Sequence, residues 1–216
     1  TEYEAIVYDL DGTLVRLDVD WDAVRERCAA VLRARDVDVE GANIWDMREL
    51  AADHGHLDRV DGVIAEFERD GARSASRLAR ADDLPHQVPV GVCSLNCVAA
   101  CRIALELHGL DGHVDAVVGR DSVETVKPDP GPLLAAVESL GARPERTLFV
   151  GDSDSDGETA RRAGTDFEWA EYRLPRSRLP LVAARIELSL RSSLASLAVL
   201  LGVPATFGAR ASARPS

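Results

Sequence analysis

Lysine is almost absent from this 216-residue chain, in which Lys127 is the only one and arginine supplies every other cation. The net charge is −12, which argues against a protein that binds nucleic acid non-specifically. An acidic surface poor in lysine suits a salt-rich cytoplasm, although a GC-rich genome would also replace lysine with arginine. We therefore expect a cytoplasmic protein with a halophilic surface.

Long hydrophobic runs are also missing. The apolar stretch at residues 194–203 is shorter than the ~20 residues that a membrane-spanning helix needs. The first residues are acidic and lack a long apolar core, so we expect no secretion signal. These features argue against a membrane partner.

Cysteine occurs only four times, and the spacing indicates no disulfide framework. Cys93, Cys97 and Cys101 recur every four residues, which predicts one shared helical face if the helix begins early enough. No nearby histidine or CxxC motif accompanies them. Small buried side chains are therefore favoured over a metal site for these residues.

The remaining composition is that of a globular protein, with 46% apolar and 29% charged residues. A chain of this length can bury one core and a small second lobe. Residues 4–10 read as a buried strand. Further strands are expected at residues 88–93, 114–118, 147–150 and 166–170, with helices between them. This alternation predicts an α/β fold with a parallel sheet and helices on both faces.

Residues 16–86 have a different pattern. Apolar side chains such as Val24, Cys28 and Leu32 fall at helical spacing, and charged residues fill the other faces. The segment reads as a helical insert of about two hairpins, with breaks near Gly41, Gly55 and Gly71.

Residues 173–216 differ again, because they contain seven arginines and a single acid, Glu187. We consider a docked helix, a partly ordered tail and an altered terminus for this segment. A poorly specified basic tail without an assigned function is favoured.

Two carboxylates, Asp9 and Asp11, follow the first strand and precede Gly12. Residues i and i+2 of a strand project to one side, and parallel sheets bind ligands beyond the carboxyl ends of their strands. Two acids there can hold a divalent cation and leave one oxygen free to attack. A hairpin turn at Asp11-Gly12 is the simpler alternative, and a calcium loop fits less well because Leu14 stands where that loop needs glycine.

Four features occur in order, each after a strand: Asp9-Leu10-Asp11-Gly12-Thr13, then Ser94, then Lys127-Pro128-Asp129, then the run from Gly151 to Asp156. Together they resemble the haloacid dehalogenase-like superfamily of phosphotransferases over residues 4–170. The resemblance implies a Rossmann-like core made of residues 1–15 and 87–172, with residues 16–86 as a helical cap. The position of the cap is similar to that in the subgroup with phosphoglycolate phosphatases.

The resemblance also implies roles for these residues. Asp9 would attack phosphorus, and Asp11 would protonate the leaving alkoxide and later deprotonate water, so the neighbouring carboxylates should raise the pKa of Asp11. The Mg²⁺ ligands would be Asp9, Asp152 and the Asp11 carbonyl, with Asp156 in support. The phosphate would be bound by Asp9, Gly12, Thr13, Ser94, Leu95 and Lys127.

A phosphate monoester repels a carboxylate nucleophile, so the site must supply positive charge. Lys127 is a fixed cation, and the amides after Ser94 open a helix whose N-terminus favours phosphate. Asn96 would either contact the substrate or cap that helix. The cap residues Arg16, Arg48, His54 and Arg69 are considered as contacts for a substrate anion, but an ordinary surface role is favoured for each.

The presence of Asp11 helps to distinguish which reaction of the superfamily this chain would catalyse. Its dehalogenases lack this second aspartate, and its phosphonatases use a cap lysine that is missing here. A phosphatase acting on a small phosphorylated metabolite, as a monomer or homodimer, is the favoured reading. A phosphomutase and a catalytically silent regulator that binds phosphate or metal remain open.

Overall fold

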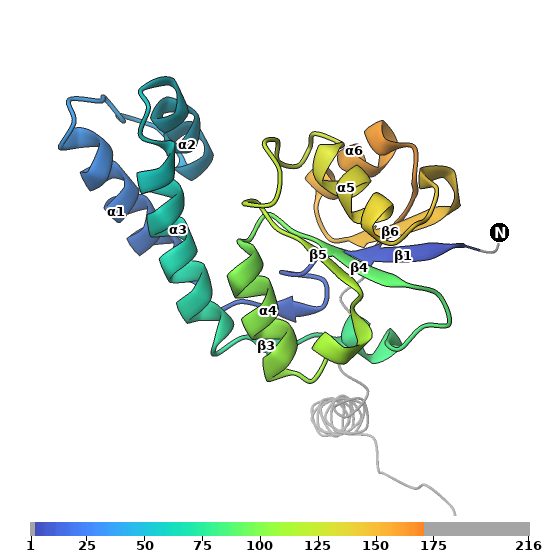
Figure 1. Ribbon diagram of the computed structural model, residues 1–216. Helices are drawn as coiled ribbons and strands as arrows, with labels where there is room; N and C mark the ends of the chain where they lie inside the picture. The colour runs from blue at the N-terminus through green and yellow to red at the C-terminus, as the bar shows by residue number, and fades with distance from the viewer. Residues whose placement is uncertain (1–2, 171–216) are drawn as a thin grey trace, which may run out of the picture. The chain divides into compact units, whose positions relative to one another are not determined.

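The computed structural model describes residues 3–170, which fold around a five-stranded sheet (Figure 1). Its strands are β1 (Ala5–Tyr8), β4 (Val90–Cys93), β5 (Ala116–Val118), β6 (Thr147–Gly151) and β7 (Asp166–Trp169). They lie in the order β5-β4-β1-β6-β7, and all neighbouring pairs are parallel. The predicted α/β class is confirmed. The basic tail predicted at residues 173–216 lies outside the described residues.

The helices of the core cover both faces of this sheet. They are α4 (Val98–Leu107), α5 (Gly131–Ser139) and α6 (Asp154–Ala163), with short 3₁₀ turns at Ala79–Asp83, Asp111–His113 and Pro144–Arg146. Because side chains alternate along a strand, Val7 packs into the cluster with α5 and α6, whereas Tyr8 packs into the cluster with α4. The sheet is therefore buried on both faces, as parallel sheets usually are.

Cys93, Cys97 and Cys101 do not share a helical face, because the condition that the helix begins early enough is not met. Cys93 ends β4 and packs on the α5 and α6 side of the sheet, whereas Cys97 and Cys101 pack on the α4 side. The helix begins only at Val98, too late to include Cys93. All four thiols are free and buried, and within residues 3–170 no cysteine joins a group that could hold a metal.

Three helices lie between β1 and β4, where about two hairpins were expected: α1 (Trp21–Arg33), α2 (Ile44–Asp53) and α3 (Leu57–Ala72). Gly41 and Gly55 lie between them, and Gly71 lies near the end of α3. The three helices share a hydrophobic cluster that includes Val24, Cys28, Leu32, Met47 and Ile64. This apolar cluster gives the insert a core of its own.

The insert begins and ends at a short antiparallel ribbon. Its strands are β2 (Val15–Arg16) and β3 (Ser76–Arg77), and Val15 lies opposite Arg77. Beyond the ribbon, α3 packs alongside α4 of the core (Figure 1). The insert therefore contacts the core near the start of α4 as well as at the ribbon.

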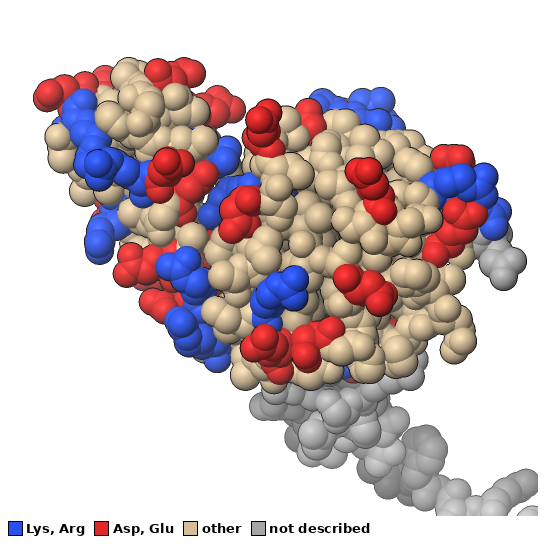
Figure 2. All heavy atoms as spheres, viewed as in Figure 1, with Lys and Arg blue, Asp and Glu red and all other residues tan. Residues whose placement is uncertain are grey.

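Acidic and basic side chains are intermixed on the face that Figure 2 shows. Within residues 3–170, no helix combines the length and the apolar character that a membrane span requires.

Candidate active site

A cavity of about 170 Å³ opens beyond the carboxyl ends of β1, β4 and β6. The candidates from the sequence that line it are Asp9, Asp11, Ser94, Leu95, Asn96, Lys127, Asp152 and Asp156. Ser153 and three residues of the insert, Trp21, Trp45 and Glu68, complete the lining. Segments far apart in the sequence thus meet in one cavity, which lies where open α/β sheets bind ligands.

The two carboxylates after β1 reach this cavity from a loop. The strand ends at Tyr8, and the Asp9 amide continues the sheet pairing by donating to the Val150 carbonyl at 2.8 Å. The Asp11 carboxylate accepts a hydrogen bond from the Leu17 amide at 2.9 Å. Asp9 and Asp11 therefore lie beyond the end of β1. The prediction that they project to one side as residues i and i+2 of a strand is wrong. The hairpin alternative is also wrong, because both neighbours of β1 in the sheet are parallel.

Gly12 lets the loop backbone approach Asp152 closely. Its φ is +92°, and a Cβ at this position would lie 2.0 Å from Oδ2 of Asp152. Only glycine fits this combination of left-handed backbone and close approach. Thr13 is buried, and among residues 3–170 its hydroxyl has no hydrogen-bond partner, but Thr13 is not among the residues that line the cavity.

Lys127 lies at the centre of the site and is buried. Its Nζ donates to Oδ1 of Asp9 at 2.8 Å, to the Cys93 carbonyl at 3.2 Å and to Oδ1 of Asp156. Burial alone would lower the pKa of Lys127, but the charges of Asp9 and Asp156 raise it, so the side chain is an ammonium ion. The only lysine of the chain therefore supplies a fixed positive charge beside Asp9.

Three carboxylates gather around this ammonium group. One oxygen each from Asp9, Asp152 and Asp156 lies within 4.8 Å of the others. Burial raises the pKa of Asp9 to about 7, although the Lys127 charge opposes the shift. Burial also raises the pKa of Asp152, and Asp156 adds to that effect. A divalent cation among these oxygens would offset both burial and mutual repulsion, and carboxylate oxygens are the ligands that Mg²⁺ prefers.

Asp11 has the raised pKa that an acid needs. The main cause is burial, and the charges of Asp152 and Glu68 contribute less. The direction agrees with the expectation from the sequence, but the leading cause differs from the one expected there. Desolvation favours the protonated form, which can give a proton to a leaving group.

The loop after β4 holds the Ser94 hydroxyl in the cavity wall. Ser94 Oγ donates to Oδ1 of Asn96 at 3.0 Å, and the Asn96 side chain donates to Glu68 at 3.3 Å. The helix-cap alternative for Asn96 is wrong, since the residue before α4 is Cys97. The expected anion site at this helix start is also occupied, because Glu68 accepts from the Cys97 amide and Asp121 from the Val98 amide.

The sequence reading missed four residues of this region. Glu68 on α3 and Arg120 after β5 form a buried ion pair, and Trp21 and Trp45 line the cavity from α1 and α2. Trp21 was visible only as part of an apolar helical face. Nothing in the local sequence distinguishes Glu68 from the other acids of the insert, because its partner lies 52 residues away.

The four cap residues considered as anion contacts lie outside the lining of this cavity. Arg48 forms two hydrogen bonds with Asp61, at 2.8 and 3.1 Å, and the His54 ring contacts the Leu50 carbonyl. Among residues 3–170, the one side-chain hydrogen bond at Arg69 is made to its backbone carbonyl, which accepts from the Arg73 side chain at 3.3 Å. Of the four, Arg16 is the one whose charge acts on carboxylates in the cavity.

The charge of Arg16 lowers the pKa values of both Asp11 and Asp152, against the raising effect of burial. It therefore lies close to these two carboxylates, although it is not among the residues that line the cavity.

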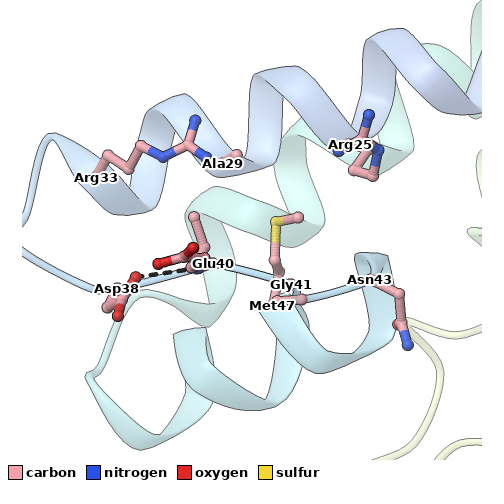
Figure 3. A pocket seen from close by; sticks show the side chains of 10 residues that line it. Arg25, Ala29, Arg33, Asp38, Glu40, Gly41, Asn43 and Met47 are labelled. Carbon is pink, nitrogen blue, oxygen red and sulfur yellow. Dashed lines mark hydrogen bonds between the residues drawn. The ribbon is translucent and has the colours of Figure 1, made fainter.

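Two other cavities are larger than the one with the carboxylates. One of about 620 Å³ lies in the insert, where Arg25 and Arg33 of α1 face a loop that carries Asp38 and Glu40 (Figure 3). It includes none of the candidate site residues. The other, of about 520 Å³, adjoins the catalytic cavity and shares Trp45, Leu95 and Lys127 with it.

The chain is similar to known proteins in both sequence and structure. Residues 3–164 match the family model described as haloacid dehalogenase-like hydrolase. A phosphoglycolate phosphatase of Rhodospirillum rubrum is 32% identical over 239 aligned residues, covering 99% of this chain and 97% of that protein. A pyrophosphatase of Bacillus mycoides, PpaX, is 42% identical over 76 residues, covering 35% of each chain.

Solved structures share the fold. A Geobacter sulfurreducens hydrolase of the same superfamily has a TM-score of 0.51 and 26% identity, covering 76% of this chain and 85% of that one. A Lactobacillus plantarum structure has a TM-score of 0.59 and 23% identity, covering 79% and 87%.

Proposed function

The chain belongs to the haloacid dehalogenase-like hydrolases, and we propose that it is a phosphatase that hydrolyses small phosphomonoesters with Mg²⁺. The observation that supports this most directly is the Lys127 ammonium group, which contacts Asp9 and Asp156 in the cavity that Asp11 and Asp152 also line. That arrangement provides a nucleophile, an acid and positive charge for an incoming phosphate.

The residues present fit a magnesium ion. Asp9, Asp152 and Asp156 offer three close carboxylate oxygens, and a single ammonium group leaves this cluster with excess negative charge. When bound, Mg²⁺ neutralises charge on the phosphate and on the attacking carboxylate. We propose that Asp9 and Asp152 hold it directly, with the Asp11 carbonyl, and that Asp156 supports them.

We propose a reaction in which Asp9 is the nucleophile and Asp11 the acid and base, which the positions of both carboxylates in the cavity support. An oxygen of Asp9 attacks phosphorus, the bond to the alcohol oxygen breaks, and protonated Asp11 gives its proton to that oxygen. Asp11 then removes a proton from water as the water oxygen attacks the aspartyl-phosphate. This step releases inorganic phosphate and restores the Asp9 carboxylate. Lys127 holds Asp9 in place, and Ser94 and Leu95 with Gly12 and Thr13 are the proposed phosphate contacts.

We propose further that residues 16–86 act as a cap over a core formed by residues 1–15 and 87–172, with residues 173–216 as a basic tail. The shared cluster of α1, α2 and α3 supports a separately packed cap. The acidic, lysine-poor composition supports a salt-rich cytoplasm as the working environment, with a small phosphorylated metabolite as substrate. Whether the protein works as a monomer or a homodimer is tested by its mass in solution.

The experiment is an assay of inorganic phosphate release from a panel of small phosphomonoesters at low and at multimolar KCl. The panel starts with 2-phosphoglycolate, the substrate in the name of the Rhodospirillum rubrum relative. We expect turnover that EDTA abolishes, Mg²⁺ restores and Asp9→Asn removes. Asp154→Asn is the matched control, because Asp154 is an exposed acid at the start of α6, two residues after Asp152. EDTA-resistant hydrolysis, or full activity of Asp9→Asn, would refute the proposal.

A further inference from the structure

Two of the three tryptophans of the chain line the catalytic cavity. Trp21 begins α1 and Trp45 lies in the first turn of α2, and their exposed fractions are 39% and 40%. The third, Trp169, packs edge-on against Phe167 with ring centroids 5.1 Å apart. Within residues 3–170, neither Trp21 nor Trp45 has an aromatic ring or a cation as a stacking partner. Their indole rings are thus available to a ligand.

The charged groups that line the cavity already have partners. Glu68 binds Arg120 and accepts from Asn96 and the Cys97 amide. Lys127, the only cation among the described residues that line the cavity, binds Asp9 and Asp156 and would face the phosphate that they receive. The insert therefore presents indole rings and one neutralised acid to the cavity, and it presents no cation there.

Cations outside the lining are less suited to a second anionic group. Arg48 lines the adjoining cavity, but two of its nitrogens bind Asp61. Arg16 acts on Asp11 and Asp152 from outside the lining. A carboxylate on the alcohol part of a substrate would have to bind one of these two arginines. Because Arg48 pairs with Asp61 and Arg16 lies closer to the carboxylates in the cavity, Arg16 is the residue that an acidic substrate would use.

Resting on the proposed phosphatase function, we propose that the alcohol part of the substrate is uncharged and carries a planar apolar ring that lies against Trp21 and Trp45. Leu95 continues the apolar wall between the phosphate site and the adjoining cavity, in which Trp45 also takes part. Indole rings offer large apolar faces and bind planar groups through offset or edge-to-face contacts. The phosphate faces Asp9 while the ring is withdrawn from water between the cap residues.

The size of the cavity limits the ring. Its volume of about 170 Å³ is below the ~300–1,000 Å³ that is usual for drug-sized ligands, so a phosphate and a single ring are the natural occupants. The adjoining cavity of about 520 Å³ gives room for a substituent on that ring.

The test compares phosphate esters of primary alcohols, so that the reactivity of the leaving group stays similar. Benzyl phosphate carries a planar ring, cyclohexylmethyl phosphate a ring of similar size that is not planar, 2-phosphoglycolate an anion and phosphocholine a cation. We expect the largest kcat/KM for benzyl phosphate. Trp21→Leu and Trp45→Leu should each lower it by roughly tenfold, with much smaller effects on ethyl phosphate.

Trp169→Leu is the matched control, because this exposed tryptophan lies on β7 outside the cavity. The largest kcat/KM for 2-phosphoglycolate, with its loss in Arg16→Gln, would overturn the inference in favour of a carboxylate site. Preference for phosphocholine, equal use of the two ring esters, or uniform losses on all esters in the tryptophan variants would overturn it too. In each of these cases ethyl phosphate is still turned over and Asp9→Asn is inactive, whereas failure of the proposed function means that no ester is hydrolysed.

Discussion

Glu68 on α3 and Arg120 after β5 form an ion pair that is almost completely buried, with 1% and 2% of their side chains exposed. The same carboxylate accepts from the Cys97 amide at 3.0 Å, where a negative charge complements the N-terminus of α4. Asn96 connects Glu68 to Ser94 through two further hydrogen bonds. One residue of the insert thus ties α3 to the core and to the loop of the proposed phosphate site.

Removing one member of this pair should cost far more stability than removing an exposed charge. We expect Glu68→Leu or Arg120→Leu to lower the free energy of unfolding by about 3–5 kcal/mol, because the first leaves buried Arg120 with only the partly exposed Asp61 and the second leaves buried Glu68 without this cation. The double variant should recover part of that loss. Urea denaturation followed by circular dichroism measures both effects.

Asp70→Asn is the control for this series. Asp70 lies on the same helix and pairs with Arg73, but their side chains are 71% and 60% exposed, so little change in stability is expected. Equal losses of unfolding free energy in Asp70→Asn and Glu68→Leu would contradict the prediction that burial makes the Glu68–Arg120 pair more important for stability.

Magnesium should stabilise the folded protein. A ligand that binds only the native state adds about 2.7 kcal/mol at one hundred times its dissociation constant, so the melting temperature should rise with Mg²⁺ and fall with EDTA. Asp152→Asn should remove most of this rise, and Asp154→Asn should retain it. Differential scanning fluorimetry reads these shifts without an assay of activity. A magnesium-dependent rise that survives in Asp152→Asn would assign the ion to another site.

Replacing the only lysine should remove the charge that accompanies the nucleophile. We expect Lys127→Met to lower kcat on the order of 10²–10³-fold, as loss of a fixed charge from a buried site does. Lys127→Arg should rescue little, because a planar guanidinium cannot replace a compact ammonium between Asp9 and Asp156. Arg161→Met is the control, because this exposed arginine pairs with Glu158 on α6 and is not among the residues that line the three cavities. Activity close to normal in Lys127→Met would contradict the assigned role.

The cysteines should resist alkylation until the protein unfolds. All four are buried, and burial raises the pKa of Cys28 to about 11 and that of Cys93 to about 12. Only the thiolate reacts, so iodoacetamide at pH 8 should give no adduct in the native protein and four in urea. Mass spectrometry counts the adducts. A native adduct at Cys97 or Cys101 would mean that the start of α4 opens readily.

Much of the core could be predicted from the sequence, because its signals are local. Strands followed directly by polar residues indicated which segments end at the same edge of a parallel sheet, and these residues do meet in one cavity. Element boundaries were less predictable. Strand β1 ends before Asp9, so strand alternation does not apply to Asp9 and Asp11. Helix α4 begins after Cys97, so Cys93 is not on that helix and Asn96 does not cap it.

The sequence by itself determined the α/β class, since this depends on short apolar runs and the polar residues that follow them, and the resemblance of its motifs to a known family singled out the acids and the lysine that line the cavity. Only the tertiary structure decided what the insert contributes. Glu68 reaches Arg120, and Trp21 and Trp45 reach the cavity, because of the way α1, α2 and α3 pack onto one another and α3 packs against α4. Such contacts depend on the distance and angle between packed helices, which no local pattern along the chain specifies.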